Sequence, residues 1–153
     1  MRHFEQEIFI RCARRQVYEH LAEPGNLIGL QPLLTSLEAL PERRGENGII
    51  LRPFHTVETF RWLGIPILNN RIYSVAHLTN PYKILKHVVQ SKPSIEIEFN
   101  YLFEDRDGDT QLTQKVDIQR VSLLLENFVY SEALKAQRAL LANLKTRLEA
   151  RTP

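Results

Sequence analysis

Six consecutive segments between Leu33 and Gln119 alternate apolar and polar residues, and this run limits the possible folds more than any other feature. The alternation is cleanest over residues 94–104, SIEIEFNYLFE, where the aliphatic and aromatic side chains fall on one side and most polar ones on the other. A period of two is typical of a strand with one buried and one solvated face. The run therefore predicts an antiparallel sheet that is covered on one face only.

Turn residues divide this run into six predicted strands joined by short loops. The strands cover residues 34–42, 49–62, 67–78, 82–90, 94–104 and 110–119. A seventh strand is predicted before them, over residues 3–11, HFEQEIFIR. Pro53 lies inside the second segment of the run. Because proline cannot donate a ladder hydrogen bond, it predicts an edge position or a bulge there.

Two short helical segments are predicted between the first strand and the second. Residues 13–26, ARRQVYEHLAEPGN, place apolar residues at helical spacing, and the pattern ends at Pro24-Gly25. Residues 26–34, NLIGLQPLL, predict one or two further helical turns.

A long helix is predicted from about Leu123 to Ala150, where the apolar period changes to 3.6. Its stripe contains four leucines: Leu134, Leu141, Leu144 and Leu148. It is the only predicted element long enough to cover one face of a seven-stranded sheet. The order of strand, two short helices, six strands and long helix therefore predicts an α+β protein.

Tyr130 and Gln137 lie in the middle of that leucine stripe, where a core-packing helix normally carries aliphatic residues. Either they are satisfied polar groups in a filled core, or the helix covers a partly polar cavity. We expect Tyr130, Leu134 and Gln137 in the first half to line a cavity. The leucines of the second half are expected to pack on the sheet.

Composition and charge exclude several classes of protein. The 153 residues fit one domain, 1–153, with 43% hydrophobic and 25% charged residues. The net charge is +2 and the basic residues are scattered, so no nucleic-acid partner is expected. Cys12 is the only cysteine, which favours the reducing cytoplasm. No apolar run reaches about eighteen residues, so transient membrane contact is the most that the sequence predicts.

The order of elements and three phrases resemble the helix-grip fold of the Bet v 1-like (SRPBCC) superfamily, which includes START-related and polyketide cyclase/dehydrase-like proteins. The phrases are EIFIRCARRQVYEHLAEPGNL at 7–27, FNYLFEDRDGDTQLTQKV at 99–116 and LLANLKTRLEA at 140–150. The resemblance implies a curved seven-stranded antiparallel sheet wrapped around a long C-terminal helix, with two short helices after the first strand. It also implies an elongated cavity for lipids, polyketides, isoprenoids or other apolar molecules.

No motif for metal binding or covalent catalysis stands out. DRDGD at 105–109 places its glycine fourth, where a calcium loop of the EF-hand type needs it sixth, so a tight polar turn is the better interpretation. The five histidines lack zinc-ligand spacing, and no Gly-x-Ser-x-Gly segment is present. We expect neither a metal nor a cofactor, and no catalytic residue is assigned.

The candidate ligand-binding residues are mostly polar side chains on apolar faces. His87 shares a strand face with Leu85 and Val89, and Arg71 shares the phase of Tyr73. An apolar pocket with a few polar anchors is typical of small-molecule sites. The predicted set is Arg71, Tyr73, His87, Phe99, Tyr101, Gln114, Tyr130, Leu134 and Gln137.

Three functions remain open at this point. The first is a carrier or sensor for an apolar small molecule such as a lipid, polyketide or isoprenoid. The alternative is a polyketide cyclase or dehydratase-like enzyme that uses cavity Tyr, His and Arg side chains for acid–base chemistry. The third is a regulatory interaction protein that uses the glutamate-bearing strand face. The sequence leaves the oligomeric state open.

Overall fold

The chain forms one curved antiparallel sheet in which the first strand pairs with the last. A computed structural model describes residues 2–62, 65–91 and 95–151. Over these residues eight strands run in the order β1-β8-β7-β6-β5-β4-β2, and β3 pairs with β4. The strands are β1 Arg2–Ile10, β2 Leu34–Ala39, β3 Arg43–Arg44, β4 Ile50–Trp62, β5 Ile65–Asn80, β6 Ile84–Ser91, β7 Ile95–Arg106 and β8 Asp109–Arg120.

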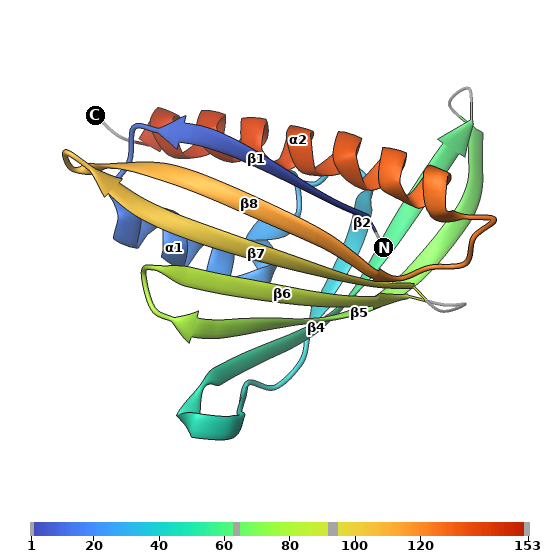
Figure 1. The fold of residues 1–153 in the computed structure, drawn as a ribbon, viewed down its shortest axis with the longest axis horizontal. Coiled ribbons are helices and arrows are strands. Elements are labelled where there is room, and N and C mark those ends of the chain that lie inside the picture. Colours follow the sequence, from blue (N-terminus) through green and yellow to red (C-terminus); the bar gives the residue numbers. More distant parts are fainter. Residues whose placement is uncertain (1, 63–64, 92–94, 152–153) are drawn as a thin grey trace.

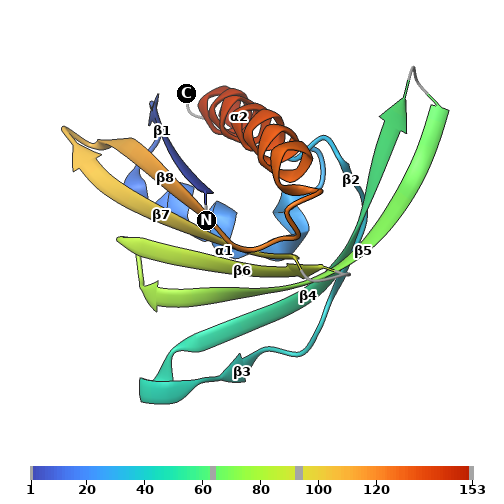
Figure 2. The same cartoon turned by 45° about the vertical axis from the view of Figure 1, so that its right-hand side comes forward.

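The helices lie on the concave side of this sheet, which curves around the long helix (Figures 1 and 2). They are α1 Arg14–Ala22, the short 3-10 helix η1 Pro24–Leu27 and α2 Glu126–Arg151, whereas the 3-10 helix η2 Glu46–Gly48 lies at the turn between β3 and β4. The predicted helix-grip arrangement is confirmed, with α1 and η1 between the first two strands. Two-residue strand β3 is additional, because Arg43 and Arg44 of a predicted turn pair with Leu51 and Ile50.

Strand β7 shows why the sheet has one dry face. Ile97, Phe99, Tyr101 and Phe103 are buried on the concave side, as the alternation predicts. Glu98 lies on the opposite side, where its carboxylate is 3.5 Å from the Lys86 ammonium on β6. Apolar residues at every second position thus fix which face of the strand meets the helix.

The turn between β7 and β8 accounts for the aspartates of DRDGD. Its two central residues, Asp107 and Gly108, have positive φ angles of 55° and 93°. The Asp105 side chain also accepts a 2.9 Å hydrogen bond from the Gly108 backbone N–H. Two left-handed residues suit the twist of a two-residue hairpin, which explains the Asp-Gly pair. The predicted polar turn is confirmed.

Pro53 lies on β4 where the outer pairing changes partner. Ala39, the last residue of β2, is opposite Phe54, and β3 begins opposite Leu51. The Pro53 carbonyl accepts a 3.0 Å hydrogen bond from the Leu40 N–H just after β2. The proline nitrogen faces the same side as its carbonyl, so no hydrogen bond to β5 is lost. β4 is paired on both sides and has no bulge at Pro53, so the predicted edge position or bulge is wrong, and the proline instead lies where β2 ends and β3 begins.

The segment before β2 is less helical than predicted. Residues 26–34 contribute only the end of η1 and a turn in which the Leu30 N–H donates to the Leu27 carbonyl over 3.0 Å. Gly29 then adopts φ 85°, which ends any helical path. Arg147 of α2 holds this loop by donating to the carbonyls of Asn26 and Ile28 at 2.7 and 3.0 Å.

Helix α2 begins at Glu126, three residues after the predicted start, and the preceding Leu123–Leu125 are exposed. Its second half packs as predicted, with Leu141, Leu144 and Leu148 buried together with Leu140. Within the described part of the chain, no helix is both long and apolar enough to cross a membrane.

The first half of α2 is rotated relative to the prediction. Tyr130 packs edge-on against Phe4 of β1, with 5.7 Å between ring centroids, and the Arg2 guanidinium lies 3.7 Å from its ring centroid. Leu134 follows one turn later on the same face of the helix. Both side chains are half-buried and neither lines the cavity described below. The cavity is lined from α2 by the positions one residue earlier, Val129 and Ala133.

Candidate functional site

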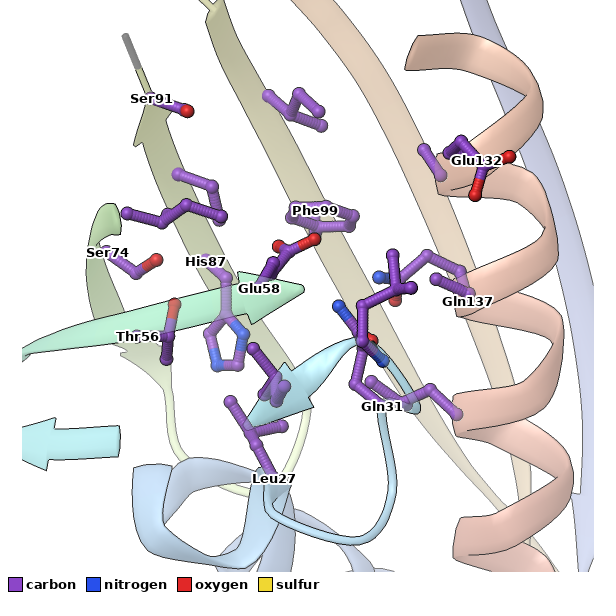
Figure 3. Close-up of a pocket in the computed structure, with 18 of the residues that line it drawn as sticks. Leu27, Gln31, Thr56, Glu58, Ser74, His87, Ser91, Phe99, Glu132 and Gln137 are labelled. Atoms are coloured by element: carbon purple, nitrogen blue, oxygen red, sulfur yellow. Dashed lines mark hydrogen bonds between the residues drawn. The ribbon is translucent and has the colours of Figure 1, made fainter. Parts of the chain in front are cut away.

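A cavity of about 130 Å³ lies between the sheet and the first half of α2 (Figure 3). Alternate positions on β4, β5, β6 and β7 reach it, because every second side chain of a strand points to the concave face. The apolar lining residues are Leu27, Leu33, Leu34, Phe54, Ile72, Val89, Ile95, Ile97, Phe99, Phe128, Val129, Ala133, Ala136 and Leu140. The polar lining residues are Gln31, Thr56, Glu58, Ser74, His87, Ser91, Tyr101, Glu132 and Gln137.

A chain of buried amides supports one wall of the cavity. Gln114 of β8 is fully buried, and its Nε2 donates to the Tyr101 hydroxyl at 3.1 Å and to Gln137 Oε1 at 2.8 Å. Gln6 Nε2 donates in turn to Gln114 Oε1 at 2.6 Å. The network links β1, β8, β7 and α2, so it fixes the positions of Tyr101 and Gln137 relative to the cavity.

Tyr101 is held in the neutral, hydrogen-bonding form. Burial raises the pKa of its hydroxyl above the ordinary value of 10, and the hydrogen bond from Gln114 opposes only part of that shift. Since its oxygen accepts from Gln114, the hydroxyl hydrogen remains available to a ligand acceptor. Gln137 likewise uses its Oε1 for Gln114, which leaves its amide N–H groups as donors.

His87 is a buried imidazole in an apolar setting. It is 4% exposed, and its ring lies 5.4 Å from the Tyr101 ring and 6.2 Å from the Phe54 ring. Burial lowers its pKa to about 4, so the ring is neutral at pH 7. Its Nε2 atom is enclosed without a hydrogen-bond partner among the described residues. Such a buried unpaired polar atom costs about 1–3 kcal/mol unless something pairs with it.

Glu58 of β4 places a carboxyl group in the same cavity, next to Gln31. The Gln31 Oε1 accepts from the Leu33 N–H at 2.5 Å, so its amide N–H is the group that donates to Glu58. Burial raises the Glu58 pKa to about 7, and the Gln31 hydrogen bond offsets part of this. The carboxyl is therefore close to half-protonated at neutral pH.

The structure brings together some of the sequence-predicted residues and separates others. His87, Phe99, Tyr101 and Gln137 line the cavity, and Gln114 lies directly behind two of them. Tyr130 and Leu134 lie instead towards β1, as described above.

The inward orientation predicted for Arg71 and Tyr73 is wrong. Ile72 and Ser74 are buried on β5 and line the cavity, so the alternating residues Arg71 and Tyr73 lie on the convex face. Arg71 is exposed, and the Tyr73 ring packs 5.4 Å from the His55 ring of β4. The strand contains polar residues on both faces, so its phase could not be chosen from hydrophobicity.

Two polar lining residues that are hydrogen-bonded to each other, Glu58 and Gln31, were not predicted. A signal for Glu58 exists, because it falls in phase with Phe54 and Thr56 on β4 and so faces inward if they do. Gln31 lies in a loop without periodicity, so no pattern marks it. In the part of the chain that the structure describes, no three His, Cys, Asp or Glu side chains are grouped so as to hold a metal ion.

By sequence, neither a protein-family profile nor a curated protein matches this chain. By structure it is similar to the ZhuI aromatase/cyclase from a Streptomyces species, with 16% identity, TM-score 0.79 and coverage of 99% of this chain and 96% of that one. A Thermus thermophilus protein is 16% identical, with TM-score 0.75 and coverage of 99% of this chain and 100% of that one. A START superfamily protein from Mycobacterium smegmatis is 13% identical, with TM-score 0.69 and coverage of 98% of this chain and 99% of that one. These similarities establish that this chain shares its helix-grip fold with them.

Proposed function

We propose that this protein binds an apolar small molecule in the cavity between its sheet and α2, as a carrier or sensor. The observation that carries the proposal is a mostly apolar cavity into which a few supported polar side chains point. This combination is typical of small-molecule sites. The size of the cavity, about 130 Å³, suits a single ring or a short aliphatic chain. A larger ligand requires α2 to move away from the sheet.

The polar side chains of the cavity supply hydrogen bonds rather than a nucleophile. Tyr101 and Gln137 offer donors, and Glu58 offers a carboxyl group. Covalent catalysis would need a hydroxyl or thiol hydrogen-bonded to a base that a third group orients. Thr56, Ser74 and Ser91 bring hydroxyls to the cavity, but the Nε2 atom of His87 has no hydrogen-bond partner among the described residues. The free thiol, Cys12, instead donates a 3.1 Å hydrogen bond to Gln16 on α1 and is not among the lining residues. Reversible binding is therefore the function that this chemistry supports best.

A cavity-filling variant tests the proposal. Ala136 of α2 is buried and lines the cavity, whereas Ala142 of the same helix is exposed. We expect Ala136→Phe to abolish copurification of a small molecule, detected by native mass spectrometry, while Ala142→Phe retains it. Detection of the same bound molecule in wild type and Ala136→Phe would place the ligand elsewhere. Failure to bind any apolar compound in a broad screen would refute the function.

Acid–base catalysis of the cyclase or dehydratase type is a second candidate, favoured by the buried and unpaired His87 beside Tyr101. A neutral imidazole can accept a proton, and a phenol with a raised pKa can donate a hydrogen bond to a carbonyl oxygen. The ZhuI neighbour carries the aromatase/cyclase name. Under this hypothesis, His87→Gln and Tyr101→Phe each lower turnover of a poly-β-keto compound by about 100-fold or more. Unchanged turnover in both variants would exclude it.

A further inference from the structure

Both charged side chains that line the cavity are acidic. They are Glu58 of β4 and Glu132 of α2, and no lysine or arginine lines the cavity in the described part of the chain. Glu132 is already paired with Lys135 of its own helix, with 3.0 Å between Nζ and Oε1. Glu58 receives its hydrogen bond from the uncharged amide of Gln31. Among described side chains, no cation forms an ion pair with Glu58.

A second group in the cavity also lacks a partner. The His87 Nε2 atom is enclosed and unpaired, and the ring is neutral because burial lowers its pKa. A neutral imidazole carries its hydrogen on one nitrogen and accepts with the other, so the tautomer decides whether Nε2 pairs with a ligand acceptor or a ligand donor. In Figure 3 the Glu58 side chain from β4 and the His87 side chain from β6 both border the cavity, and the Glu58 carboxyl and the His87 ring extend in different directions. The cavity thus holds a carboxyl group without a cationic partner and an imidazole nitrogen without a hydrogen-bond partner among the described residues.

Resting on the proposed function, the geometry points to an apolar amine as the ligand, whose protonated nitrogen is bound by the Glu58 carboxylate. A carboxylate ligand would bring a third negative charge to Glu58 and Glu132 and would offer no donor to the Glu58 carboxylate. A neutral alcohol can donate one hydrogen bond but leaves the Glu58 charge uncompensated. The expected order of affinity is amine, then alcohol, then carboxylate.

Proton release follows from the same arrangement. The Glu58 pKa is about 7 in the empty cavity, so an ammonium group beside it favours the ionised form. Amine binding at pH 7 then expels roughly half a proton, whereas alcohol binding expels none. The other ionisable side chains that line the cavity are His87 and Tyr101, both neutral at this pH, and the ion-paired Glu132.

The test uses three probes with the same apolar body: 2-phenylethylamine, 2-phenylethanol and phenylacetate. Affinities come from nuclear magnetic resonance titrations of the full chain, and proton release comes from calorimetry in two buffers of different ionisation enthalpy. We expect the amine to bind at least about 10-fold more tightly than phenylacetate. Glu58→Gln should remove the preference of amine over alcohol and the proton release, while the alcohol still binds. Glu38→Gln, an exposed carboxylate on β2, is the matched control.

The outcomes separate this inference from the proposed function. Binding of phenylacetate as tight as that of the amine overturns the amine assignment, while binding of any of the three probes in the cavity leaves the proposed function standing. An amine preference that persists in Glu58→Gln removes Glu58 as the recognition group. If none of the three probes binds, the amine assignment fails, while the broad screen of apolar compounds decides the proposed function. If Glu58→Gln does not fold, the ranking and proton release measured on the wild type still decide the question.

Discussion

Glu58 and His87 should affect stability in opposite directions over nearly the same pH range. Glu58 has a folded-state pKa of about 7 against an ordinary value of 4.5, so between these values the folded protein binds more protons and stability falls as pH rises. His87 has a folded-state pKa of about 4 against 6.5, so the unfolded chain binds more protons and stability rises with pH. Between about pH 4.5 and 6.5 the two effects largely cancel.

Single substitutions should separate the two opposing pH dependences of the free energy of unfolding. Each pKa difference corresponds to at most about 3 kcal/mol, or about 1.4 kcal/mol per pH unit. Relative to wild type, Glu58→Gln should therefore gain up to about 3 kcal/mol in free energy of unfolding between pH 4 and pH 8. His87→Gln should show the reverse, with its relative stability greatest near pH 4.

Urea unfolding followed by circular dichroism at several pH values measures both differences. A constant offset between wild type and variant is expected from lost packing and does not bear on the reasoning, because only the pH slope reports the ionisation. Glu38→Gln, which removes an exposed carboxylate on β2, is the matched surface control. If the difference between wild type and either cavity variant is independent of pH, the burial argument for that residue is refuted.

Three further predictions address the hydrogen bonds behind the cavity, the packing of α2 and the orientation of Arg71 on β5. Gln114→Leu should lower the free energy of unfolding, measured in urea, by about 2–4 kcal/mol, because it leaves polar groups of Gln6, Tyr101 and Gln137 unpaired. A loss below about 1 kcal/mol would contradict the stabilising role of this network. Leu144→Ala should lower it by about 3–5 kcal/mol, and the exposed Leu124→Ala by less than about 0.5. Arg71→Ala should leave ligand affinity unchanged in a calorimetric titration, and weaker binding would show that Arg71 reaches the cavity.

The fold followed from the sequence because apolar periodicity and turn chemistry agreed over most of the chain. The residues of β7 alternate without interruption, and Asp107-Gly108 marks the hairpin that follows. These signals depend on local sterics and burial, which act over a few residues. β3 was not predicted, because a two-residue strand is too short to show any period.

The site followed from the sequence only in part, because inward orientation depends on strand phase. His87 and Tyr101 were correctly placed inside because clearly apolar neighbours set the phase of their strands. Arg71 belongs to a strand with polar residues at both phases, so nothing local distinguishes its faces. On α2, a rotation by about one residue moved Tyr130 from the cavity towards β1, and only the packing of the helix on the sheet determines that rotation.

The pairing of β1 with β8, which places Phe4 against Tyr130 of α2, is expected to form late in folding. Phe4 aligns with Val116 and Arg2 with Ile118, so the first strand waits for a partner more than a hundred residues away. Closing so long a loop is entropically unfavourable and slow compared with forming the hairpins from β4 to β8. During synthesis, the first strand leaves the ribosome long before β8 and α2 exist. A nascent chain therefore has no enclosed site until β8 and α2 have been synthesised, and a ligand of the proposed kind can stabilise the protein only from then on.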